Sequence, residues 1–249
     1  MISLTAVDGI PEIEPGDDLA AIIAAALAAA NIGLQAEDVL VVTQKVVSKA
    51  EGRVVELATI SPRPEAVAWA AQWGKDARQV ELVLQESVEV LRMATGGLII
   101  SRTRHGFVCA NAGVDLSNVG GGDVATLLPL DPDESARALR ERLGELAGSR
   151  PAVVISDSFG RPWRNGIVDV AIGCAGLEPL IDLRGTADAD GRVMHSTVIA
   201  VADELASAAE LAGGKVTGEP VVLVRGYRYE PGTSPATALV MDRELDLFP

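Results

Sequence analysis

Residues 155–166 have the sequence ISDSFGRPWRNG and continue an apolar run that begins at Ala152. The run predicts a buried strand, and the glycines and proline after it predict a loop that presents an acid, a hydroxyl and two arginines. Carboxylate and hydroxyl oxygens are ligands for Mg²⁺ or Mn²⁺, and guanidinium groups pair with phosphate or carboxylate. An Asp-Ser pair after a strand is also common in turns that hydrogen-bond their own backbone, so both interpretations stay open on this stretch alone. The candidate residues are Asp157, Ser158, Arg161 and Arg164.

Length and composition predict one unit with a large apolar core. The chain has 249 residues, of which 48% are hydrophobic and only 3% aromatic, so Ala, Val and Leu must do most of the packing. No internal repeat, low-complexity tract or linker divides it. We therefore expect a single domain over residues 1–249.

Charge and cysteine content exclude several classes of protein. The net charge of -14 disfavours nonspecific binding to nucleic acid or to an anionic membrane, so a polyanionic ligand would need a local cluster of cations or a metal ion. The two cysteines, Cys109 and Cys174, suggest neither a disulfide framework nor a structural zinc site. There is no signal peptide pattern, and the longest apolar stretch, residues 19–30, is too short to span a membrane. These features predict a cytoplasmic protein.

Hydrophobic periodicity and capping signals predict a mixture of helices and strands. The clearest helix is residues 132–147, because Asp131 is a good N-cap residue and a proline follows it at the first helical position. Residues 97–103 and 106–110 predict a hairpin. Further helices are expected at residues 19–30, 65–73, 79–93 and 202–211, and further strands at residues 38–43, 169–176, 180–184 and 221–226.

Residues 44–53 place three cations and a hydroxyl directly after the strand expected at residues 38–43, in an otherwise acidic chain. That placement favours an anion site, with Lys45 and Lys49 on one face if the segment is helical. The phosphate-binding motif GxxxxGK[ST] is absent from the chain, so phosphates would have to be held by other means. A solvated basic helix start is the alternative.

Two glycine-rich segments are further candidates. Residues 111–123 contain Asp115, a candidate metal ligand, and Asn118, which could hydrogen-bond a base, a ribose or a phosphate. Their glycines do not make the dinucleotide-binding motif GxGxxG. The helix exit at residues 213–220 contains Lys215 and could let backbone N–H groups approach phosphate. Each segment could equally be a plain turn or helix stop.

Four segments, taken together and in order, resemble one family, the coenzyme F420-0:γ-glutamyl ligases. The resemblance extends over residues 9–226, and several of the segments are long enough to be specific. The segments are residues 10–18 (IPEIEPGDD), 42–52 (VTQKVVSKAEG), 105–115 (HGFVCANAGVD) and 157–164 (DSFGRPWR).

The resemblance implies a fold and an activity. The fold would be α+β, a mixed arrangement particular to the family with two interleaved lobes, and neither a Rossmann nor an ATP-grasp fold. The activity would be that of a homodimeric, GTP-dependent ligase that joins L-glutamate to the carboxylate of the deazaflavin precursor F420-0 and releases GDP and phosphate. Two sites for Mg²⁺ or Mn²⁺ are implied, with K⁺ as a further ion. Some relatives carry a fused C-terminal reductase-like domain, and because this chain stops at Pro249 we expect the freestanding form.

The resemblance also assigns site residues by position. Asp115 and Asp157 would hold one metal ion, and Ser158 would contribute to a second. The nucleotide would be contacted by Ile10, Pro11, Glu12, Ile13, Gln44, Lys49, Asn118, Gly213, Gly214, Lys215, Val216, Thr217 and Gly218.

Three of these positions depart from the family's usual residues. Ser158 stands where the family has Thr and keeps the hydroxyl ligand. Gln44 stands where Ser or Thr is usual and can still donate a hydrogen bond, with a different reach. Lys215 stands where Gln is frequent and cannot ligate a metal while it is protonated, so contact with phosphate is the alternative.

The residue types agree with activation of a carboxylate by phosphorylation. A carboxylate accepts an amine only when its oxygen becomes a leaving group, so GTP would first convert it to an acyl phosphate, which the glutamate amine then attacks. Such a transfer needs positioning and neutralisation of charge, for which two metal ions held by Asp115, Asp157 and Ser158, with Lys49 as an additional cation, are candidates. From charge alone, Arg161 and Arg164 would bind glutamate or the precursor's phosphodiester. A metal-dependent nucleotide phosphohydrolase and a nucleotide-binding module without turnover remain alternatives.

Overall fold

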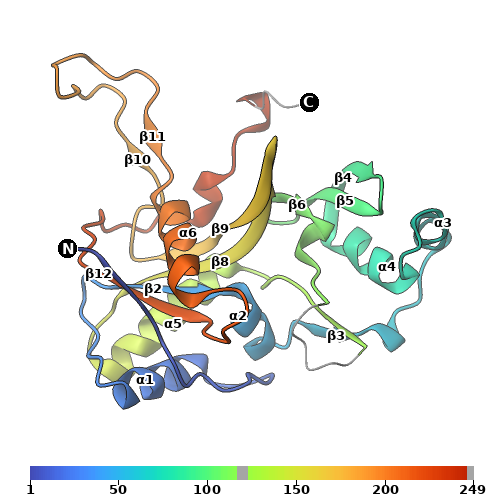
Figure 1. Cartoon of the computed structure of the whole chain (residues 1–249), viewed down its shortest axis with the longest axis horizontal. Helices are drawn as coiled ribbons and strands as arrows, with labels where there is room; N and C mark the ends of the chain where they lie inside the picture. Colours follow the sequence, from blue (N-terminus) through green and yellow to red (C-terminus); the bar gives the residue numbers. More distant parts are fainter. Residues whose placement is uncertain (117–122, 246–249) are drawn as a thin grey trace.

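A five-stranded mixed sheet forms the centre of the computed structural model, which describes residues 1–116 and 123–245 (Figure 1). The strand order is β1-β12-β2-β8-β9. Strands β2 and β8 are parallel, and the other neighbouring pairs are antiparallel. The strands are β1 (Ser3–Ala6), β2 (Val39–Thr43), β8 (Ala152–Arg161), β9 (Arg164–Ala175) and β12 (Val221–Arg225).

Helices cover both faces of this sheet because its central strands are apolar on both sides. In β2, Leu40 and Val42 pack into the core shared with α1 and α5, whereas Val39 and Val41 pack into the core shared with α6. Figure 1 shows α1 and α5 below the sheet and α6 above it. The helices are α1 (Leu19–Ala29), α5 (Pro132–Ala147) and α6 (Val201–Gly213).

The chain between β2 and α5 forms a second lobe with a core of its own. It leaves the first lobe through α2 (Gln44–Ala50) and returns through α5, so the second lobe is inserted into the first. The lobe contains a two-stranded sheet, β3 with β7, and a three-stranded antiparallel sheet, β4-β5-β6. Its elements are β3 (Val54–Glu56), α3 (Pro64–Trp73), α4 (Ala77–Glu86), β4 (Ser87–Ala94), β5 (Leu98–Thr103), β6 (Val108–Ala110) and β7 (Val124–Thr126).

The remaining elements are short. A projecting arm carries β10 (Ile181–Asp182) paired with β11 (Val198–Ile199) (Figure 1). Among the helices of the described residues, none has the length and apolar character needed to cross a membrane. Residues 1–116 and 123–245 also contain four short 3₁₀ helices: η1 (Leu57–Thr59), η2 (Asn111–Gly113), η3 (Ala236–Leu239) and η4 (Arg243–Leu245).

The expected α+β fold with two interleaved lobes is confirmed. The helix predicted at residues 132–147 is α5, and the carboxylate of Asp131 accepts a hydrogen bond from the Glu134 amide at 2.9 Å, as its N-cap role requires. The predicted hairpin is β5 and β6. The helices expected at residues 19–30, 65–73 and 202–211 and the strands expected at residues 38–43 and 221–226 are present to within two residues at each end.

The prediction of a loop directly after Ile155 was wrong. The strand continues to Arg161 and pairs with β9 along its length, and the chain reverses at Pro162 and Trp163. Trp163 adopts the left-handed conformation, with φ of 54°, that this tight reversal requires. The polar residues are tolerated in a strand because Asp169 on β9 stands opposite Ser158 and bonds it. The strand expected at residues 169–176 is accordingly the second half of a longer strand.

The helix predicted at residues 79–93 was wrong in its second half. Helix α4 ends at Glu86, and residues Ser87–Ala94 form β4. Val88 and Val90 are β-branched and suit a strand, and β4 gains a partner in β5, where Met93 lies opposite Ile99. The strand expected at residues 180–184 is reduced to the two residues of β10.

Candidate functional site

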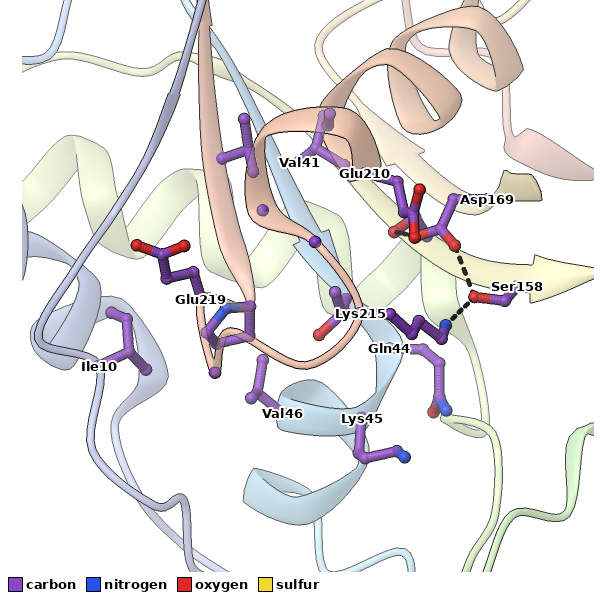
Figure 2. Close-up of a pocket in the computed structure, with 18 of the residues that line it drawn as sticks. Ile10, Val41, Gln44, Lys45, Val46, Ser158, Asp169, Glu210, Lys215 and Glu219 are labelled. Atoms are coloured by element: carbon purple, nitrogen blue, oxygen red, sulfur yellow. Dashed lines mark hydrogen bonds between the residues drawn. The ribbon is translucent and has the colours of Figure 1, made fainter. Parts of the chain in front are cut away.

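A cavity of about 490 Å³ lies where the parallel strands β2 and β8 end their pairing. Thr43, the last residue of β2, stands opposite Ser156, so the residues of β8 that follow project beyond the end of β2. The carboxyl ends of parallel strands in open sheets are common ligand sites. The other walls are the loop at residues 10–13, the start of α2 and the segment between α6 and β12 (Figure 2). Asp115 also lines the cavity.

Three lysines line this cavity in a chain of net charge -14: Lys45 and Lys49 from helix α2, and Lys215 from the segment after α6. Nζ of Lys45 lies 2.7 Å from Oδ2 of Asp115, and Lys49 forms an ion pair with Glu12 of the loop at residues 10–13. Figure 2 shows the ammonium of Lys215 reaching across the cavity to the hydroxyl of Ser158, which accepts its hydrogen bond. Lys45 and Lys49, from the segment predicted as an anion site, thus line the same cavity as Lys215.

A buried carboxylate, Asp169, organises the hydroxyls on the floor of the cavity. One of its oxygens accepts a hydrogen bond from the Ser158 hydroxyl at 2.6 Å (Figure 2). The other accepts from the Ser156 hydroxyl at 2.9 Å. Both serines therefore have fixed orientations. Since Lys215 also donates to Ser158, a continuous hydrogen-bonded row runs from Lys215 to Asp169.

Asp157 has a pKa raised to about 7 from its ordinary value of 3.8. Burial is the main cause, and the nearby carboxylates of Asp169 and Asp115 raise the pKa further, whereas the backbone N–H of Ser158 and the charge of Lys215 lower it. The carboxylates near Asp157 therefore repel one another. A divalent cation bound between Asp157 and Asp115 would offset this repulsion, so the two carboxylates are suitable ligands for such an ion.

The carboxylate oxygens of the cavity suit a cation that is coordinated partly by the protein and partly by a bound substrate. In the described part of the chain, no three His, Cys, Asp or Glu side chains gather closely enough to hold a metal by themselves. Mg²⁺ is usually bound through one or two carboxylates, with waters and substrate phosphates completing its shell. Asp115 and Asp157 could supply the carboxylates in that arrangement.

Most of the predicted site residues meet in this one cavity. Arg161 and Arg164 do not line it: they lie at the turn of the β8–β9 hairpin, roughly 13 Å further along the strand than Asp157. Thr217 does not line it either, and its hydroxyl donates to the backbone carbonyl of Gly213. Asn118 lies outside the described residues. The predicted residues that line the cavity are Ile10, Pro11, Glu12, Ile13, Gln44, Lys49, Asp115, Asp157, Ser158, Gly213, Gly214, Lys215, Val216 and Gly218.

Several lining residues were not predicted. Asp169 is the most important of them, and its position opposite Ser158 is fixed only by the register of the hairpin. The short Pro-Trp turn between two segments of polar and β-branched residues is a sequence signal that could have predicted this hairpin. The other lining residues without a predicted role include Thr43, Ser156, Glu210 and Glu219.

Comparison with known proteins identifies the family. The family model described as F420-0:Gamma-glutamyl ligase matches residues 9–226. The chain is 47% identical to a protein named Coenzyme F420:L-glutamate ligase from Methanothermobacter thermautotrophicus, over 99% of this chain and 98% of that protein. A protein of the same name from Methanopyrus kandleri is 45% identical over 95% of this chain and 93% of that protein. Another, from Methanocaldococcus jannaschii, is 42% identical over 85% of this chain and 84% of that protein. The chain belongs to the F420-0:γ-glutamyl ligase family.

Proposed function

We propose that this protein is a GTP-dependent ligase that forms an amide bond between L-glutamate and the carboxylate of F420-0, releasing GDP and phosphate, in the biosynthesis of coenzyme F420. Near full-length relatives named Coenzyme F420:L-glutamate ligase support this activity. The observation that carries it is the cavity, which gathers three lysines and the carboxylates of Asp115 and Asp157 from separate segments of an acidic chain.

The nucleotide would contact the loop at residues 10–13 and the segment at residues 213–218, which both line the cavity. The N–H of Gly214 donates to the Glu210 carbonyl at 2.8 Å, so the backbone N–H groups that would meet phosphate are those of the residues that follow the two glycines at the end of α6. Lys49 is buried in the last turn of α2 and would pair with a phosphate in place of Glu12. Gln44, also buried, has its oxygen occupied by the Ser48 hydroxyl at 2.8 Å, which leaves its NH₂ group to donate.

Asp115 and Asp157 would hold a divalent ion, Mg²⁺ or Mn²⁺. When bound, that ion neutralises charge that builds up on the transferring phosphoryl group. The residues of the chain would supply the remaining positive charge through Lys45, Lys49 and Lys215.

The reaction would proceed in two displacements. A carboxylate oxygen of F420-0 attacks the γ-phosphorus of GTP, and the bond from that phosphorus to the β,γ-bridging oxygen breaks, so GDP leaves. The glutamate amine, as the neutral base, then attacks the acyl carbon. The C–O bond to the phosphoryl group breaks, phosphate departs with one oxygen of the original carboxylate, and the nitrogen loses a proton. The lysines would favour both steps, because negative charge shifts between phosphate and carboxylate oxygens near their ammonium groups in each step.

Phosphate release tests this proposal against its alternatives. Release from GTP should require both L-glutamate and F420-0, and ¹⁸O placed in the acceptor carboxylate of F420-0 should appear in the phosphate. A nucleotide phosphohydrolase would release phosphate without glutamate and without ¹⁸O transfer. A binding module would release none.

The family resemblance also supports a homodimer. Light scattering on the purified protein should then give a mass twice the 25.9 kDa of the chain. A mass equal to that of one chain would contradict this assignment.

A further inference from the structure

The hydroxyl of Ser158 is engaged on two sides by this chain's own residues. Its hydrogen is directed to Asp169, 2.6 Å away, and its oxygen accepts a hydrogen bond from the ammonium of Lys215. Asp169 is buried and is also held by Ser156, so it fixes the direction of the hydroxyl. The ammonium therefore occupies space next to the oxygen that a metal ion would need.

A divalent ion and the ammonium would compete for this place. An ion coordinated by the Ser158 oxygen would lie roughly 2.0 to 2.5 Å from it. Two positive charges on one hydroxyl oxygen, only about 4 Å apart, repel each other strongly in a site partly shielded from water. Within the described part of the chain, Lys215 forms no salt bridge with a carboxylate, so no ion pair draws it away from Ser158.

We infer that Lys215 takes the place of a second divalent ion in this protein. The site would hold one divalent ion, at Asp115 and Asp157, and the ammonium anchored on the Ser158–Asp169 pair would supply the second positive charge toward the phosphates of the nucleotide. This inference rests on the proposed function for the identity of the nucleotide. The position of the ammonium itself rests only on the contacts described.

The flanking chain suits such a role. Lys215 follows two glycines at the end of α6, and its side chain crosses the mouth of the cavity to reach β8 (Figure 2). The residue is otherwise exposed, so its replacement should leave folding intact. The ammonium thus lies between solvent and the cavity floor, where an entering phosphate would meet it.

The test counts bound metal without turnover. Equilibrium dialysis against Mn²⁺ and the non-hydrolysable analogue guanosine 5′-[β,γ-imido]triphosphate gives bound Mn²⁺ and bound nucleotide per chain. The wild type should bind one Mn²⁺ per chain, and Lys215→Gln, which removes the charge and offers an oxygen, should bind two. Lys215→Arg should keep one, because it retains the charge. Lys75→Gln, which changes the net charge equally at an exposed position outside the cavity, should also keep one.

Any wild-type count other than one Mn²⁺ per chain would overturn the inference, and so would a Lys215→Gln protein that still binds one. Thermal unfolding of each variant confirms that the counts refer to folded protein. The proposed function fails separately: a protein that binds the analogue together with one Mn²⁺ but forms no ligase product would contradict the ligase activity and leave this inference standing.

Discussion

Asp169 lies directly opposite Ser158 in the β8–β9 hairpin and accepts a hydrogen bond from its hydroxyl at 2.6 Å. Its second oxygen accepts from Ser156 at 2.9 Å. One buried carboxylate thus orients both hydroxyls that border Asp157. Groups that orient metal or phosphate ligands in this way commonly matter nearly as much as the ligands themselves.

Replacement of Asp169 by Asn should therefore impair catalysis more than folding. An amide has one acceptor oxygen and turns an NH₂ donor toward the other hydroxyl, so one serine loses its acceptor. We expect kcat to fall roughly 10- to 100-fold, with the melting temperature lowered by only a few degrees. Ser207→Ala is the matched control, because Ser207 donates to the backbone carbonyl of Asp169 and not to its carboxylate. Equal kcat values for the two variants would contradict the orienting role.

Asp157→Asn should abolish most of the activity by removing a ligand of the divalent ion. We expect a loss on the order of 100-fold or more in kcat/KM for GTP, together with weaker nucleotide binding in the presence of Mn²⁺. Titration of a fluorescent GTP analogue with and without Mn²⁺ measures the second effect. If the variant kept the wild-type dependence on Mn²⁺, the metal site would have to lie elsewhere.

Arg161→Ala tests the substrate-binding role suggested by its charge. Arg161 and Arg164 are at the hairpin turn and outside the cavity lining, so they would contact the part of a substrate that extends beyond the cavity. The expected result is a KM raised several-fold for glutamate or for F420-0, with kcat little changed, as for lost uniform binding. Arg184→Ala, which removes an arginine paired with Asp182 on the projecting arm, is the control. Unchanged KM for both substrates would exclude the role.

The second lobe should lose stability in acid through Glu81. The guanidinium of Arg63 bonds the Glu81 carboxylate at 2.8 to 3.0 Å and lowers the pKa of Glu81 to about 2, against the opposing effect of burial. Because this pKa is depressed in the folded state, the stabilisation is present above the ordinary value of 4.5 and is lost as the pH falls from there toward 2.

Glu81→Gln should accordingly lower the free energy of unfolding at pH 7, and the difference from wild type should shrink between pH 5 and pH 3. Chemical denaturation across that range measures it. Glu14→Gln, at an exposed position in the first lobe, should show no such trend. A Glu81→Gln difference that stayed constant with pH would contradict the ion-pair account.

Local signals predicted much of the fold. Helix α5 was predictable because Asp131, Pro132 and the αL Gly148 mark its ends within the sequence. Strand β4 was not, since residues 87–94 carry a pattern that fits a helix until β5 supplies its partner. Whether such a stretch becomes a helix or a strand depends on its pairing with a distant segment, and the periodicity of the sequence does not reveal that pairing.

The site was predictable to the extent that its residues lie in recognisable segments. Asp115, Asp157 and Lys49 meet in the cavity as the resemblance implied. Asp169 could not be found in this way because its place in the site depends on the register between β8 and β9. A shift of that register by one residue would turn its side chain to the other face of the sheet.

Product mass tests the central claim most directly. Purified protein is incubated with GTP, Mn²⁺, L-glutamate and F420-0, and the deazaflavin product is analysed by mass spectrometry. The account predicts a product heavier than F420-0 by one or more glutamyl residues, formed only when GTP and glutamate are both present, with one GDP released for each residue added. Hydrolysis of GTP with F420-0 left unmodified would contradict it.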